Sequence, residues 1–194
     1  MQATAELTHL DAPVDAMRLI HKALRAEAGR VEDAVNQLEL GGSFKPFQRV
    51  FYRWALALGY HVITEDQYIT SQLIDAALLQ QKEAEQACVL EMLEALQTYL
   101  HEDLDRMIVI PRTQRQLRHK VIALRIAQED LLEEEEEYIL PFLRQHLPAA
   151  QQLQMIKHLL IDEEAEEQTE ILDWVAADLA AGERQLLADL QAQF

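Results

Sequence analysis

Helix-breaking residues are scarce in this chain, and their scarcity constrains the fold more than any other feature. Only five glycines and five prolines occur among the 194 residues. In the stretches between these residues alanine, leucine, glutamate and glutamine recur, and all four are strong helix formers. A protein of many short strands needs more turn residues than this chain supplies. The sequence therefore predicts an all-α fold.

Breaks in the apolar pattern divide the chain into long helices. Apolar residues at helical spacing predict a first helix over about 14–38, which stops at the glycine pair before Ser43. A second helix begins near Pro46, which suits a first helical turn, and it continues, frays or kinks over 67–75. A third helix is expected over about 77–105.

The part of the chain after the third helix contains the other proline-marked boundaries. A fourth helix is predicted over about 112–146, with Tyr138 facing inward and with Pro141 as a kink or an early stop. A fifth helix follows Pro148 and continues through the acidic run 162–167, and Gly182 separates a short terminal helix.

Length and charge limit the classes of function. A chain of 194 residues predicts one domain over 1–194. The formal net charge of −17 disfavours nucleic acid and anionic membranes as partners. No apolar run reaches the roughly 20 residues that span a bilayer. Cys88, the single cysteine, excludes an intrachain disulfide, and we expect it to be a buried, inert thiol. With no secretory signal in the first residues, these features predict a soluble, cytoplasmic protein.

Two histidines are predicted to face the core. His61 continues the apolar stripe of Trp54 in the second helix, and Glu65 follows it by one turn, so imidazole and carboxylate project from one face. His21 lies among apolar residues of the first helix. An exposed His/Glu pair or a hydrogen-bonded core histidine would explain each residue alone. Two inward histidines on facing helices also suit a metal site in a helical bundle.

An internal repeat adds a second carboxylate. Residues 56–73 align with residues 126–143, which places Glu65 over Glu135 and Tyr68 over Tyr138. The second and fourth helices are therefore interpreted as corresponding halves.

Four segments carry a resemblance to a known family. They are MRLIHKALR in the first helix, GYHVITED in the second, EEEEEYILPFL in the fourth and ILDWVAADLAAGERQLLADL near the end. Together they resemble the hemerythrin-like (HHE) cation-binding proteins. The resemblance implies an up-down four-helix bundle over about 14–146 with a C-terminal helical extension, one helix or a helical pair, over about 148–194. It also implies a core site for non-haem iron, with one or two ions.

The resemblance assigns ligands residue by residue. His21, His61, Glu65 and Glu135 match ligand positions of the family. In the third helix Gln86 stands where the family has a histidine, and in the fourth helix Leu131 does so. Nearby Glu129, Glu133 or Glu134 could supply substitute carboxylates from the region 129–137 if the helix were rotated or distorted.

Three functions remain open at this point. The first is metal binding for sensing, storage or the binding of oxygen or nitric oxide. The second is a degenerate, metal-free bundle that acts as a regulatory or interaction module, with a protein partner or a second copy of the chain. The third is a di-metal oxidase with carboxylates from the fourth helix, for which the sequence nominates no substrate.

Overall fold

The computed structural model describes residues 6–73, 76–104 and 108–194. Within these ranges the chain is all-helical, as predicted, apart from one isolated bridge between Ser43 and Ile108. The α-helices in chain order are α1 (Met17–Asn36), α2 (Lys45–Tyr68), α3 (Ala76–Thr98), α4 (Pro111–Glu134), α5 (Leu140–His146), α6 (Ala149–Leu160), α7 (Glu170–Ala177) and α8 (Ala181–Gln191). Shorter helical turns adjoin them: the 3-10 turns η1 (Pro13–Ala16) and η2 (Thr70–Gln72), and the π turns η3 (Tyr99–Asp103) and η4 (Glu135–Ile139).

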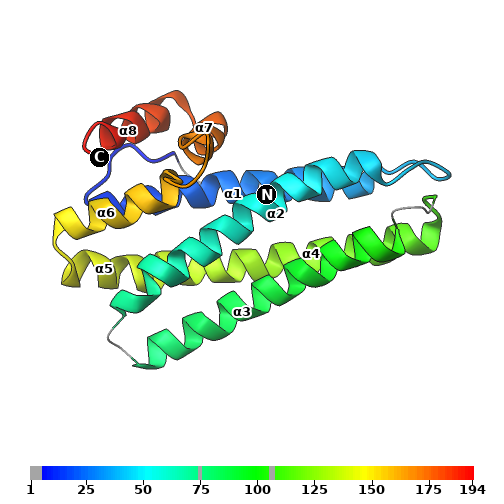
Figure 1. The fold of residues 1–194 in the computed structure, drawn as a ribbon, viewed down its shortest axis with the longest axis horizontal. Helices are drawn as coiled ribbons and strands as arrows, with labels where there is room; N and C mark the ends of the chain where they lie inside the picture. The colour runs from blue at the N-terminus through cyan, green and yellow to red at the C-terminus, as the bar shows by residue number, and fades with distance from the viewer. Residues whose placement is uncertain (1–5, 74–75, 105–107) are drawn as a thin grey trace.

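The long helices lie lengthwise beside one another, and successive ones run in opposite directions (Figure 1). α1 packs against α2 and α4, and α3 packs against the same two helices. Toward the C-terminus α6 packs on α2 and η1, while α7 packs on α1 and α6. The space between α1, α2, α3 and α4 is thus enclosed by helices on every side.

The break between α1 and α2 falls at the predicted glycine pair. Gly41 has a φ of 82°, a conformation that residues with a side chain rarely adopt. Its N–H donates to the carbonyl of Val109 at 2.8 Å, and the N–H of Val109 donates to the carbonyl of Gly42 at 2.9 Å. These bonds tie the α1–α2 turn to the segment that leads into α4.

The next boundary settles how far the second helix extends. α2 ends at Tyr68 and η2 follows, so the helix does not continue to 76. Residues 74–75 lie outside the described ranges, as does residue 105, the predicted end of the third helix.

The fourth helix runs through Pro141, where the sequence predicted a kink or an early stop. Proline has no N–H to donate and its ring crowds the carbonyl one turn earlier, and the wide π turn η4 lies just before it. The extra residue in this turn shifts the inward register to Glu135 and Ile139, which are 1% and 2% exposed. Tyr138 is consequently turned outward and is 51% exposed. The prediction that Tyr138 faces the core was wrong.

The predicted fifth helix is two helices. α6 ends at Leu160 and α7 begins at Glu170, with turns between them. The carboxylate of Asp162 accepts the N–H of Glu164 at 3.1 Å, a local bond that competes with helix formation. Repulsion among the neighbouring acidic side chains also disfavours a helix here.

The last helix begins before the glycine that was predicted to separate it. Gly182 lies in the first turn of α8, and the break falls at 178–180. The carboxylate of Glu183 accepts the N–H of Ala180 at 2.9 Å and so satisfies a backbone donor at the start of α8. This local bond, rather than glycine, fixes the boundary.

Apolar side chains from all these helices form the core. Buried residues of the C-terminal helices, including Val175 and Leu187, belong to the same hydrophobic cluster as Trp54 and Leu58 of α2. Cys88 is exposed, contrary to expectation. In the described part of the chain no helix is both long enough and apolar enough to cross a bilayer.

Candidate metal centre

Two buried histidines face each other across the interior. His21 on α1 has no exposed side-chain surface and His61 on α2 is 2% exposed. Their ring centroids lie 5.3 Å apart with an angle of 81° between the planes. The helical spacing that predicted both as inward residues therefore placed them correctly.

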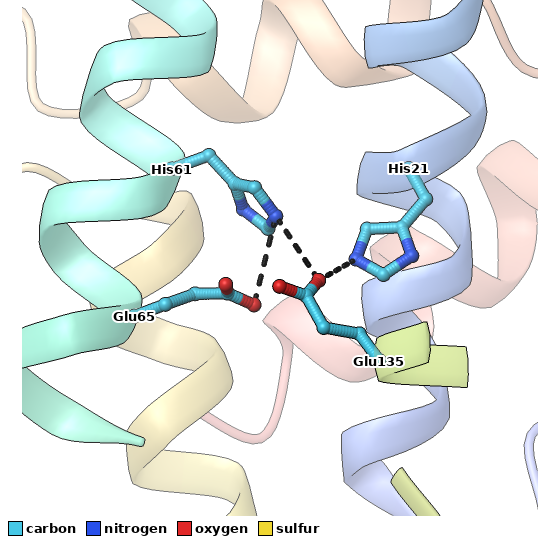
Figure 2. A group of neighbouring side chains, drawn as sticks. All are labelled: His21, His61, Glu65 and Glu135. Carbon is cyan, nitrogen blue, oxygen red and sulfur yellow. Dashed lines mark ion pairs between the residues drawn. The ribbon is translucent and has the colours of Figure 1, made fainter. Parts of the chain in front are cut away.

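Two glutamates complete the cluster. Glu65 lies one turn after His61, and Glu135 is the first residue of η4; both are buried. His21 Nε2 lies 3.2 Å from Glu135 Oε2, and His61 Nε2 lies 3.6 Å from Glu65 Oε1 and 3.8 Å from Glu135 Oε2. Figure 2 shows the four side chains converging, with His61 and Glu65 on one helix and His21 and Glu135 on two others. The structure thus brings together all four residues that the sequence nominated.

The converging atoms are buried and have mainly one another as neighbours. His21 Nε2, His61 Nε2, Glu65 Oε1 and Glu135 Oε2 make no hydrogen bond of regular geometry, and His21 Nε2 and Glu135 Oε2 form an ion pair when His21 is protonated. The group of four offers one donor atom per residue within 4.8 Å of one another. A buried polar atom without a partner costs free energy, so several aimed at one point call for a common partner. An ion about 2.1 Å from each donor keeps adjacent donors roughly 3 to 3.5 Å apart. The observed separations of 3.2, 3.6 and 3.8 Å are similar or slightly longer. The four residues could therefore hold a metal ion.

A carboxylate on the far side of the His21 ring sets its orientation. Glu136 Oε1 lies 2.8 Å from His21 Nδ1. Arg25 holds Glu136 in turn, with Nη1 2.7 Å from the same oxygen, and Arg25 Nε donates to Glu129 at 2.8 Å. Histidines that bind metals usually donate their second N–H to a carboxylate in this way. In the neutral imidazole this contact favours the proton on Nδ1 and leaves Nε2 as the atom that can bind an ion.

A lysine that the sequence analysis missed borders the same cluster. Lys82 on α3 is 3% exposed, and its Nζ donates to Glu65 Oε2 at 3.1 Å and to Glu135 Oε1 at 2.6 Å. Each glutamate therefore gives one oxygen to Lys82 and turns the other toward the histidines. The ammonium neutralises part of the charge that burial would otherwise penalise.

These contacts shift the pKa values in opposite directions. Burial, together with the charge of Glu135, raises the pKa of Glu65. Burial would raise the pKa of Glu135 as well. The positive charge of Lys82 and the neighbouring imidazoles outweigh burial, so the pKa of Glu135 lies well below its usual range. Burial alone would lower the pKa of His21, yet Glu135 and Glu136 raise it to about 9. His21 is therefore protonated near neutral pH in the metal-free protein, and an ion must displace that proton.

Gln86 and Leu131, which the resemblance to the HHE proteins aligned with histidines, stay outside the group of four. Gln86 is buried, one turn after Lys82, and its Nε2 has no partner. Leu131 is buried and apolar. Neither side chain supplies a donor to the four-atom cluster.

The other acidic residues of α4 have different roles. Glu129 binds Arg25, Glu134 accepts a hydrogen bond from Gln81, and Glu133 is exposed. None of these three belongs to the cluster, so the predicted substitution of ligands from this stretch is not observed. Glu136 has the supporting role instead.

Comparison with protein-family models, with curated proteins and with solved structures gives no match. The function of the chain is therefore inferred from the buried cluster itself. Its decisive features are the four unsatisfied donor atoms, the Glu136 contact behind His21 and the Lys82 ammonium.

Proposed function

We propose that this chain is a hemerythrin-like protein that binds non-haem iron through His21, His61, Glu65 and Glu135. The observation that carries the proposal is the convergence of four buried donor atoms that have no hydrogen-bond partner. Two imidazoles with carboxylates are a donor set that suits divalent iron, manganese or zinc. Among these, iron is the ion that the resemblance to the HHE proteins implies.

The packing of the helices supports the family assignment. Each of α1, α2, α3 and α4 contacts two of the others, as expected of an up-down four-helix bundle. The internal repeat pairs Glu65 with Glu135, and these two residues make equivalent contacts, one oxygen to Lys82 and one toward the histidines. On this proposal α6, α7 and α8 are the C-terminal extension.

The residues around the ion define what the centre would do. Four protein donors leave an iron ion with coordination positions for a small ligand such as oxygen or nitric oxide, or for water. Glu136 would keep His21 oriented, and the enclosing helices would keep bulk water from the centre. Sensing, storage and the binding of a small ligand are the functions consistent with such a site.

Metal analysis of protein purified anaerobically from iron-supplemented cells tests the proposal. The wild-type protein should retain stoichiometric iron after desalting, and His61→Ala should lose it while keeping the helical circular dichroism spectrum. His119→Ala, which removes an exposed histidine of α4, is the matched control and should retain iron. Iron absent from wild-type protein would refute the proposal.

One observation favours a second function, that of a metal-free regulatory or interaction module. Lys82 and a protonated His21 together balance the charges of Glu65 and Glu135 without any ion. In that case added Fe(II) would leave the melting temperature unchanged, whereas a bound ion would raise it.

A further inference from the structure

Each of the two buried glutamates has a side-chain nitrogen close to each of its oxygens. Glu65 directs Oε1 toward His61 and Oε2 toward Lys82 Nζ, and Glu135 directs Oε2 toward the histidines and Oε1 toward the same Nζ. Carboxylates that bridge two metal ions divide their oxygens in this way, one to each ion. Here an ammonium group holds one of the two positions.

We infer that Lys82 takes the place of a second metal ion, so that the centre binds one ion per chain. The inference depends on the proposed metal-binding function and specifies its stoichiometry. It departs from the pair of ions that two bridging carboxylates would otherwise accept.

Charge opposes a second ion. One divalent ion together with Lys82 already exceeds the charge of Glu65 and Glu135 by one unit, and a second would raise the excess to three in a buried site. Such an excess is strongly disfavoured where water cannot screen it.

The surroundings of Lys82 offer a second ion little room. The void beside Lys82 is lined by the apolar side chains of Leu78, Leu131 and Ile139 and by Gln81, Glu85, Glu134 and Glu135. Its volume is about 10 Å³, which is enough for about one water molecule and not for a hydrated ion. The oxygens that such an ion would need, Glu65 Oε2 and Glu135 Oε1, already accept hydrogen bonds from Lys82.

The test measures how many metal ions each chain binds and whether two bound ions are magnetically coupled. Apoprotein is titrated anaerobically with Fe(II) and separately with Mn(II), and the Mn(II) form is examined by electron paramagnetic resonance. We expect one ion per chain and the spectrum of an isolated Mn(II) ion. Two ions per chain with a coupled spectrum would overturn the inference while leaving the proposed function intact. No saturable binding of either ion would refute the proposed function, and the inference with it.

Two variants test whether Lys82 is the group that excludes a second metal ion. Lys82→Glu replaces the ammonium with a third carboxylate and should raise the stoichiometry to two ions with a coupled Mn(II) spectrum. Lys82→Met, which removes the charge without adding a ligand, should still bind one ion. A single ion in a folded Lys82→Glu protein would contradict the assignment of Lys82 to the second position. If Lys82→Glu fails to fold, the wild-type stoichiometry and spectrum still decide.

Discussion

Lys82 Nζ and Glu135 Oε1 form a 2.6 Å ion pair between two side chains that are 3% and 1% exposed. The pair joins α3 to the π turn that follows α4, and Glu65 of α2 accepts a second bond from the same ammonium. A buried charge of either sign is tolerated only when its partners are in place. The metal-free core therefore depends on this lysine.

Removal of the lysine charge should destabilise the metal-free protein. Lys82→Met leaves Glu65 and Glu135 without their shared ammonium, and we expect the free energy of unfolding to fall by about 3 to 5 kcal/mol. Urea denaturation followed by circular dichroism measures the change. Lys45→Met, at an exposed position, should change stability by less than about 0.5 kcal/mol. Equal effects of the two substitutions would contradict the account of Lys82.

The stability of the metal-free protein should fall as the pH rises. The pKa of His21 is raised from 6.5 to about 9, so its proton stabilises the folded state fully below pH 6.5, and this contribution is lost as the pH passes through 9. The loss amounts to about 3 kcal/mol. Urea denaturation at several pH values should show a decline between pH 6.5 and 9 that is absent from His21→Gln. The same decline in both proteins would exclude His21 as its source.

Metal affinity should change with pH in the opposite sense. An ion displaces the proton of His21, so the apparent association constant for Fe(II) should rise about tenfold per pH unit as the pH approaches 9. Anaerobic calorimetric titration in buffers of different ionisation enthalpy should show release of about one proton per ion. Affinity that is independent of pH across this range would show that His21 is not a ligand.

The carboxylate behind His21 should control affinity without binding the ion. Glu136→Gln removes the charged acceptor from Nδ1 and should weaken Fe(II) binding by about 10- to 100-fold. The neighbouring exposed residue provides the control, since Glu137→Gln leaves His21 untouched. Stability measured in parallel separates lost affinity from lost folding. Unchanged affinity in Glu136→Gln would mean that the contact does not orient the ring.

The C-terminal helices should be separable from the metal centre. Buried Glu183 accepts hydrogen bonds from Lys22 of α1 and from the backbone N–H groups of Leu7 and Ala180, so it ties α8 to α1 and to the N-terminal segment. We expect Glu183→Ala to lower the free energy of unfolding by about 2 to 3 kcal/mol, because several partly buried donors lose their acceptor. Iron content per folded chain should stay at the wild-type level. A proportionate loss of iron would show that the extension also positions the ligands.

Helical periodicity predicted the inward histidines because the inward positions repeat along each helix. His21 and His61 follow the apolar stripes of their helices, and Glu65 lies one turn after His61. The resemblance to the HHE proteins nominated Glu135, which the internal repeat also aligns with Glu65. All four lie together in the structure. Lys82 was missed because lysine side chains are normally exposed to solvent. It nevertheless lies four residues before Gln86, on the buried face of α3 that continues to Val89.

Other features had no signal of comparable strength in the sequence. Composition does not reveal the π turn at Glu135, which turns Tyr138 outward and brings Glu135 and Glu136 to opposite nitrogens of one imidazole. The apolar periodicity also predicted that the fifth helix continues through 162–167. In the structure α6 ends at Leu160, because a local hydrogen bond and repulsion between acidic side chains disfavour a helix in that stretch. Register shifts and helix ends depend on contacts that single-chain patterns do not encode.

X-ray absorption at the iron edge of the anaerobically loaded protein tests the central claim most directly. We expect a first shell of nitrogen and oxygen at about 2.0 to 2.2 Å, outer-shell scattering from two imidazole rings, and no second iron within about 4 Å. The imidazole contribution should fall in His61→Ala if that protein retains any iron. A shell of oxygen alone, without imidazole scattering, would contradict the assignment of His21 and His61 as ligands.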